Sequence, residues 1–374
     1  MAKVFIEETT LTAIGDAIRS KTGKTELIDP ANMSTEIASI TTGAGGGGYE
    51  IPDEAFMLTG DCTYLAKGAT WSWFFNLYKN KIHTQDITAM TSMFEQSPLT
   101  NQNWSNIGGF PFTFNIKNAT KFNSAFYRLG LIECPKIRGI VKWDSSTSLS
   151  NILLGNNMTS VDDLFTPEMM EGYSSFKVTS MYSCPEVSSL ISNLKYLTHI
   201  PEWWYKLKVN PESTAMYYAS YLPLYKAFLY CEKLSEAINL PVVVLNSGIG
   251  LNSNQFYDTF YHNYSLSRIT FETNTDGSPI VAQWKSQTID LTDYVGYTGL
   301  PDNLMSASVY NHDSAVETIN SLPDTSAYLA TAGGANTIKF KRDSGSATAG
   351  GAIGNLTEEE IAVATAKGWT VSLT

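Results

Sequence analysis

The chain has 374 residues, of which 43% are hydrophobic and 16% charged, and its net charge is −11 at pH 7. This length and apolar content predict a folded protein with a sizeable core, because longer chains bury a larger share of their surface. The acidic balance argues against binding to nucleic acid or to an anionic membrane, since both need a basic face.

The first forty residues are predicted to hold two short amphipathic helices, one over residues 9–22 and one starting at Asp29. Asp29 is a favoured N-cap residue, and Pro30 follows at the first helical position. Two such helices cannot hold a core of their own, so we expect residues 1–41 to attach the chain to a partner or to its own copies. The apolar residues that would make this contact are Leu11, Ile14, Ile18, Met33, Ile37 and Ile40.

Residues 42–49 form a glycine-rich run that we interpret as a flexible linker. The run formally matches the dinucleotide-binding pattern G-x-G-x-x-G. That motif must follow a strand and open a helix, whereas this run follows a predicted helix. We therefore expect a domain boundary here, with a repeat region over residues 50–280 and further repeats with a cap over residues 281–374.

From Phe56 onwards the chain repeats pairs of apolar residues that are four positions apart, each pair followed by another apolar residue. Residues four apart lie on one face of a helix, so each unit is predicted to be a helical turn leading into a short strand. Such units bury a continuous core only by stacking on their neighbours. Chance recurrence in an apolar chain is the alternative. The units are Met90/Phe94/Leu99, Phe122/Phe126/Leu131, Leu149/Leu153/Met158, Val178/Tyr182/Val187, Leu190/Leu194/Leu197, Leu224/Phe228/Leu234 and Phe256/Phe260/Leu266.

The C-terminal part is predicted to alternate helices with strands. Asp313 is the expected N-cap of one helix, and residues 338–340 are its strand. Thr357 and Glu360 have the spacing of a capping box, in which each residue caps the other. Residues 369–373 alternate apolar and polar side chains, which predicts a final strand.

Two stretches and the repeats carry a resemblance to known proteins. The run from Leu11 to Gly23 (LTAIGDAIRSKTG) resembles the opening of many phage tail and minor structural proteins. The M-x-x-M-F unit at Met90, the F-x-x-x-F units and the closing AKGWTV at 366–371 resemble BspA-like leucine-rich repeats found in such proteins. The resemblance implies an α/β fold, an irregular leucine-rich-repeat-like solenoid with a short helical N-terminal segment. The spacing departs from the family's regular repeat of about 23 residues.

The resemblance also implies a function. It indicates a virion structural protein, a tail fibre or baseplate component for host-surface attachment, with residues 1–41 on the particle and the repeats facing outward. Its partners would be other virion proteins and a host surface glycan or protein, and a trimer is suspected. A capsid head-fibre or decoration protein is the first alternative. A bacterial surface adhesin is disfavoured, because the sequence shows no signal peptide; we expect synthesis in the host cytoplasm and a final place in the virion.

We predict no enzyme activity, no cofactor and no metal site. The histidines His83, His199, His262 and His312 are isolated, and the four cysteines lack the close spacing of a zinc site, which predicts buried free thiols. The alternative is a glycan depolymerase using the carboxylates around Asp162, since two carboxylates can hydrolyse a glycosidic bond. We expect these carboxylates to form a solvated acidic surface instead.

Aromatic residues are the predicted contact residues, because rings give a large rigid area that suits sugars and protein partners. The alternative is that the rings fill gaps between irregular repeats. Only alternate residues of a strand can be buried, so at most one of Trp203 and Trp204 is expected in the core. The predicted ligand-contact or receptor-contact residues are Trp203, Trp204, Tyr205, Tyr217, Tyr218, Tyr257 and Tyr261.

Overall fold

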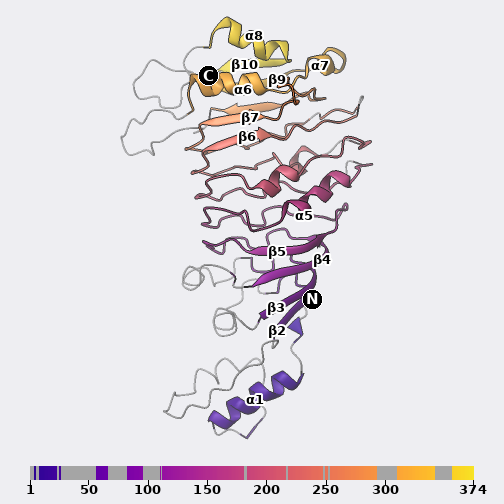
Figure 1. Cartoon of the computed structure of the whole chain (residues 1–374), viewed down its shortest axis with the longest axis vertical. Helices are drawn as coiled ribbons and strands as arrows, with labels where there is room; N and C mark the ends of the chain where they lie inside the picture. The colour runs from indigo at the N-terminus through magenta and orange to yellow at the C-terminus, as the bar shows by residue number, and fades with distance from the viewer. Residues whose placement is uncertain are drawn as a thin grey trace, which may run out of the picture.

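The structure is a computed structural model of the chain, and its described elements stack along one long axis in chain order (Figure 1). Helix α1 lies at one end of the stack, and α6, α7 and α8 lie at the other. The structure describes residues 4–5, 8–22, 25–26, 56–65, 82–95, 110, 112–180, 183–215, 218–246, 249–251, 253–292, 310–341 and 356–374.

The described part mixes helices and strands. The helices are α1 (Glu8–Thr22), α5 (Pro167–Glu171), α6 (His312–Ser321), α7 (Ser326–Ala332) and α8 (Glu358–Ala366), with 3-10 helices at Gly172–Ser175, Glu202–Lys206 and Ala219–Tyr221. The strands are β1 (Val4–Phe5), β2 (Phe56–Asp61), β3 (Ile82–Ala89), β4 (Thr113–Lys121), β5 (Lys136–Val141), β6 (Glu236–Leu240), β7 (Arg268–Phe271), β8 (Thr288–Leu291), β9 (Asn336–Phe340) and β10 (Trp369–Leu373).

Parallel pairing of successive strands builds the stack. β2, β3, β4 and β5 pair in chain order in one sheet, and β1 adds antiparallel to β2. β6 pairs with β7, and β9 lies between β8 and β10 in a third parallel sheet. These small parallel sheets with helices confirm the α/β part of the predicted fold class. Through β1, the start of the chain joins the sheet that opens the repeat region.

Between the strands, the chain repeats a bend that we call the turn unit. We number the residue positions within each unit from its first apolar residue, which is position 1. Positions 1, 4 and 5 of each turn unit are buried. In the unit from Phe122, for example, Ala125 and Phe126 are fully covered. Turn units from consecutive levels share one continuous hydrophobic core. They begin at Met90, Phe122, Leu149, Val187, Leu224 and Phe256.

Left-handed backbone at positions 3 and 7 makes each turn unit compact. Position 3 has a φ of 48–57° in every unit. This conformation costs about 1–2 kcal/mol for most side chains and least for Gly, Asn and Asp. Ser, Asn and Asp fill six of these sites and Gly155 a seventh, but Arg128, Lys226, Tyr230 and His262 are bulky. The residues at position 3 are Ser92, Ser124, Asn151, Ser189, Lys226 and Asp258, and those at position 7 are Arg128, Gly155, Asn193, Tyr230 and His262.

Hydrogen bonds between neighbouring turn units offset this backbone cost. The N–H at position 3 donates to the carbonyl at position 2 of the next unit, as from Ser92 to Asn123 at 2.9 Å. In most units the N–H groups at positions 5 and 7 likewise donate to the carbonyls at positions 4 and 6 of the next unit, as from Asn193 to Leu229 at 2.6 Å. Except between the units that begin at Leu149 and Val187, consecutive units thereby satisfy each other's backbone groups.

This geometry corrects two sequence expectations about the repeats. The residues four apart lie in the turn unit and not in a helical turn, because left-handed residues interrupt any helix. Val178 and Leu190 do not begin separate units: Val187, Leu190 and Ile191 occupy positions 1, 4 and 5 of one unit.

The C-terminal elements match the sequence more closely. The expected strands over 338–340 and 369–373 lie in β9 and β10. Thr357 and Glu360 form the predicted capping box of α8. The expected N-cap Asp313 is wrong: α6 is capped by Asn311, whose side chain accepts from the N–H of Ser314.

Candidate recognition surface

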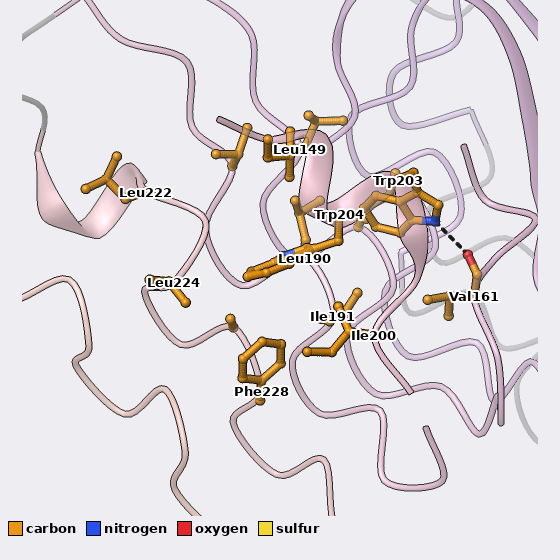
Figure 2. Packing of buried hydrophobic residues seen from close by; sticks show 14 of the residues in the cluster. Leu149, Val161, Leu190, Ile191, Ile200, Trp203, Trp204, Leu222, Leu224 and Phe228 are labelled. Carbon is orange, nitrogen blue, oxygen red and sulfur yellow. Dashed lines mark hydrogen bonds between the residues drawn. The ribbon is translucent and has the colours of Figure 1, made fainter. Parts of the chain in front are cut away.

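Trp203 and Trp204 are core residues and present no ring to solvent. Their exposed fractions are 1% and 0%. Figure 2 shows them among buried side chains, with the indole N–H of Trp203 donating to the carbonyl of Val161 at 2.9 Å. The ring of Trp204 packs on Phe228, with 5.3 Å between centroids. The expectation that only one would be buried is wrong, because they lie in a 3-10 helix and not in a strand.

The other predicted rings of this region differ in their surroundings. Tyr205 is half-buried and packs edge-on against Trp204 at 5.5 Å. Burial and the neighbouring carboxylate of Glu236 raise the pKa of Tyr205 to about 12, so its hydroxyl stays a hydrogen-bond donor at neutral pH. Tyr218 packs against the core and against Tyr221. Tyr217 lies outside the described residues.

Two stacked tyrosines mark the outer face of the last two turn units. Tyr225 and Tyr257 both occupy position 2, and their rings lie 5.5 Å apart with planes inclined by 16°. The Lys226 ammonium nitrogen is 5.8 Å from the centre of the first ring and 5.2 Å from that of the second. Asp258 forms an ion pair with this lysine, with 3.7 Å between the lysine nitrogen and a carboxylate oxygen. Tyr257 is 50% exposed, so half of its surface is accessible to a ligand.

A second ring cluster lies on the same two units. Tyr230 lies 5.6 Å from Tyr261 and 4.7 Å from the imidazole of His262, between ring centres. His262 Nδ1 is 2.6 Å from the hydroxyl of Tyr264. We call the two clusters together the aromatic strip. It consists of Tyr225, Tyr230, Tyr257, Tyr261, His262 and Tyr264.

The sequence prediction included Tyr257 and Tyr261 but did not commit to the other members of the strip. The sequence does identify most of the other members of the strip once the positions within each turn unit are known. Tyr225 and Tyr257 directly follow the first apolar residue of their units, and Tyr230 and His262 are both at position 7. Residues at equal positions of stacked units form rows, which brings these side chains together.

A groove of about 540 Å³ opens beside the segments that follow the turn units. One wall carries Thr198, His199 and Ile200, and the other carries Ser235, Glu236 and Ile238. His199 Nε2 lies 2.7 Å from a carboxylate oxygen of Asp162. A groove of this size lies within the range of ligand sites in proteins.

The carboxylates considered for glycan hydrolysis are engaged by separate partners. Asp162 lies 2.7 Å from His199. Asp163 lies 3.0 Å from Lys136 and 3.7 Å from Arg138. Glu171 lies 3.5 Å from Lys206. These pairs are partly exposed, which is typical of a solvated charged surface. They do not present two carboxylates with the divergent environments that acid and base roles require.

The predicted attachment residues are described only in part. Ile18 in α1 is 4% exposed, and Ile14 packs against the core, so the chain itself covers part of this face. The side chain of Leu11 and all of Met33, Ile37 and Ile40 lie outside what the structure describes. The linker over residues 42–49 does so as well.

The cysteines are free thiols, as expected, with Cys134 half-buried and the other three buried. Burial raises the pKa of Cys62 and Cys231 to about 12, so neither is a ready nucleophile. Within the described part of the chain, no three His, Cys, Asp or Glu side chains converge in a way that could hold a metal ion. None of the helices described here is long and apolar enough to cross a bilayer.

The surface of the described residues thus has two features that suit recognition, the aromatic strip and the groove. Comparison of the chain with protein-family models, with curated proteins and with solved structures finds no match.

Proposed function

We propose that the protein is a binding protein that recognises its ligand through the aromatic strip, on an irregular leucine-rich-repeat-like solenoid. The repeated buried positions and the hydrogen bonds between consecutive turn units support the solenoid. The observation that carries the function is the stacked pair of Tyr225 and Tyr257 on the outer face. Exposed rings held by their neighbours lose little entropy when a ligand packs on them.

The biological setting that we propose is a phage virion. The chain is a tail fibre or baseplate component that attaches to the host surface, with residues 1–41 bound to other virion proteins. The support is the sequence resemblance of the run from Leu11 to Gly23 and of the repeats. Lateral contact through the attachment segment would suit a trimer.

A capsid head-fibre or decoration protein is the alternative, and the same surface would serve it. The two roles differ in the virion proteins that contact residues 1–41, so cross-linking from this segment in assembled particles separates them. A glycan depolymerase is less favoured, because Asp162 and Asp163 are each paired with a separate basic side chain.

Binding of the full-length protein to host cells and to their purified surface polysaccharide tests the recognition role. Replacing one exposed ring, Tyr257→Ala, is expected to weaken binding by about twofold to tenfold, since one ring contact contributes about 0.5–1.5 kcal/mol. Tyr196→Ala is the matched control, because Tyr196 is 42% exposed but lies outside the strip. Equal binding by both variants and the unaltered protein would refute a role for the strip. Release of reducing ends from the polysaccharide would favour the depolymerase.

A further inference from the structure

In the described stretch from residue 129 to residue 272, the segments that follow the turn units are joined by backbone hydrogen bonds at each level but one. The N–H of Ile137 donates to Leu164, and that of Thr198 to Thr159, at 2.9 and 3.1 Å. Further along, Ser267 donates to Ser235 at 2.8 Å. Between residues 198–208 and residues 234–241, all of them described, no backbone hydrogen bond is formed.

This break is local, because the turn units of the same two levels remain joined. Ser189 donates to Tyr225, and Asn193 donates to Leu229. The cause lies in the segment after Ile200. Pro201 lacks an N–H and begins the 3-10 helix, whose Trp203 and Trp204 turn into the core. The extended backbone before Pro201 therefore ends before it can pair with β6.

The groove of about 540 Å³ occupies this break, and β6 forms one of its walls. β6 belongs to a two-stranded sheet with β7, so its second edge faces the groove. An open strand edge presents N–H and C=O groups that can pair with an added strand. The bulge at Asn239, with a φ of 55°, limits the regular part of the edge to residues 236–238.

The side chains of the groove favour an uncharged ligand. Lys208 is paired with Glu272 at 2.6 Å, and Glu236 with Arg268 at 3.3 Å. Their charges are matched within the protein, so a charged ligand would gain little. Ile200 and Ile238 stand on opposite walls and offer an apolar contact between them.

We propose that the groove binds an extended, uncharged peptide segment of a partner protein, which pairs with the open edge of β6. Alternate side chains of this peptide point toward Ile200 and Ile238, because side chains alternate along a strand. A saccharide would use the hydroxyl and carboxylate groups of the groove but would leave the strand edge unpaired. The inference stands on the break in hydrogen bonding and is independent of the aromatic strip.

The test uses the full-length, isotope-labelled protein and pentapeptides that alternate threonine with valine, isoleucine, leucine or phenylalanine, with acetylated and amidated ends so that they are uncharged. We expect amide shifts at residues 198–200 and 236–238. Each peptide is also made in two methylated forms, one with its odd-numbered backbone nitrogens methylated and one with its even-numbered ones. We call these two forms the two phases. One phase is expected to abolish binding and the other to preserve it, because only alternate N–H groups face β6.

Two variants check the location. Ile238→Arg is expected to weaken peptide binding at least tenfold, while Ile140→Arg, an exposed position on β5, leaves it unchanged. Thermal unfolding confirms that both variants fold. The proposal is overturned if none of the peptides shifts these amides at a peptide concentration of about 10 mM, at which even millimolar binding is detected. It is equally overturned if both methylated phases bind like the parent, or if maltotriose binds the groove and the peptides do not.

Discussion

Asn156 and Asn263 stand at the same position of two different turn units and form the same hydrogen bond. Each occupies position 8 and donates its side-chain amide to the carbonyl at position 5 of the preceding unit. The distances are 2.7 Å to Phe126 and 2.5 Å to Phe228. Cys231, at position 8 of its own unit, places its thiol 3.1 Å from the carbonyl of Ile191. A polar side chain inside the core thus ties each of these units to the one before it.

Asn156 is the most fully bonded member of this set, which leads to a stability prediction. Its amide nitrogen also donates to Leu153, and its oxygen accepts from the N–H groups of Leu129 and Leu131. Asn156→Leu preserves the volume but leaves these buried groups unpaired, at about 1–3 kcal/mol each. We expect a loss of about 3 kcal/mol or more in the free energy of unfolding, measured by urea titration. Asn157→Leu, at the exposed neighbour, should change it by less than about 0.5 kcal/mol.

Gly139 and Gly60 provide a matched pair for close backbone packing. Both have a positive φ, of 119° and 67°. A Cβ at Gly139 would lie 2.0 Å from the carbonyl oxygen of Ile116, whereas nothing lies within 4 Å of one at Gly60. Gly60→Ala should therefore cost only the backbone term of about 1–2 kcal/mol. Gly139→Ala should cost clearly more, about 3 kcal/mol or above. Equal melting temperatures of the two variants would contradict this packing.

The buried and exposed rings are expected to respond differently to truncation. Trp204→Ala leaves a cavity beside Phe228 and should destabilise the protein by about 3–5 kcal/mol. Tyr257→Ala removes a half-exposed ring and should cost less than about 1 kcal/mol. Thermal unfolding monitored by circular dichroism measures both. A large loss for Tyr257→Ala would assign that ring to the scaffold and weaken the proposed recognition role.

Arg268 and Glu317 make part of the stability depend on pH. Hydrogen bonds from the guanidinium of Arg268 lower the pKa of the Glu317 carboxyl below its ordinary value of 4.5, although burial opposes this shift. A lowered folded-state pKa gives stability that is fully present above the unfolded-state pKa. That stability is lost as the pH falls through the folded value. The carboxylate is 39% exposed, so the pair contributes less than about 1 kcal/mol at neutral pH.

Comparing the unaltered protein with Glu317→Gln measures this contribution. We expect the protein to be more stable than the variant at pH 7, with the difference shrinking between pH 5 and pH 3. The measurement is urea unfolding at a series of pH values at low salt. A difference that stays constant over this range would show that the ion pair is not the cause.

Some features followed from the sequence because their causes are local. The capping box of Thr357 and Glu360 needs only four consecutive residues, and the strand at 369–373 follows from alternation. The spacing of Phe122 and Phe126 identified buried positions correctly, since apolar residues in a repeat must face the core. It could not identify their conformation, because a tight turn with left-handed residues and a helical turn share the same four-residue spacing.

The amino-acid sequence by itself determined that the chain is an α/β protein of repeated apolar units with a capped C-terminal helix. Only the tertiary structure decided that Trp203 and Trp204 are both buried, that Tyr225 stacks on Tyr257, and that a groove interrupts the hydrogen bonding beside β6. The physical reason is that these features depend on contacts between residues far apart in the sequence, from 24 positions for Trp204 and Phe228 to 42 for Trp203 and Val161. Such contacts depend on the register in which the units stack, and a one-residue change in that register would place different side chains side by side.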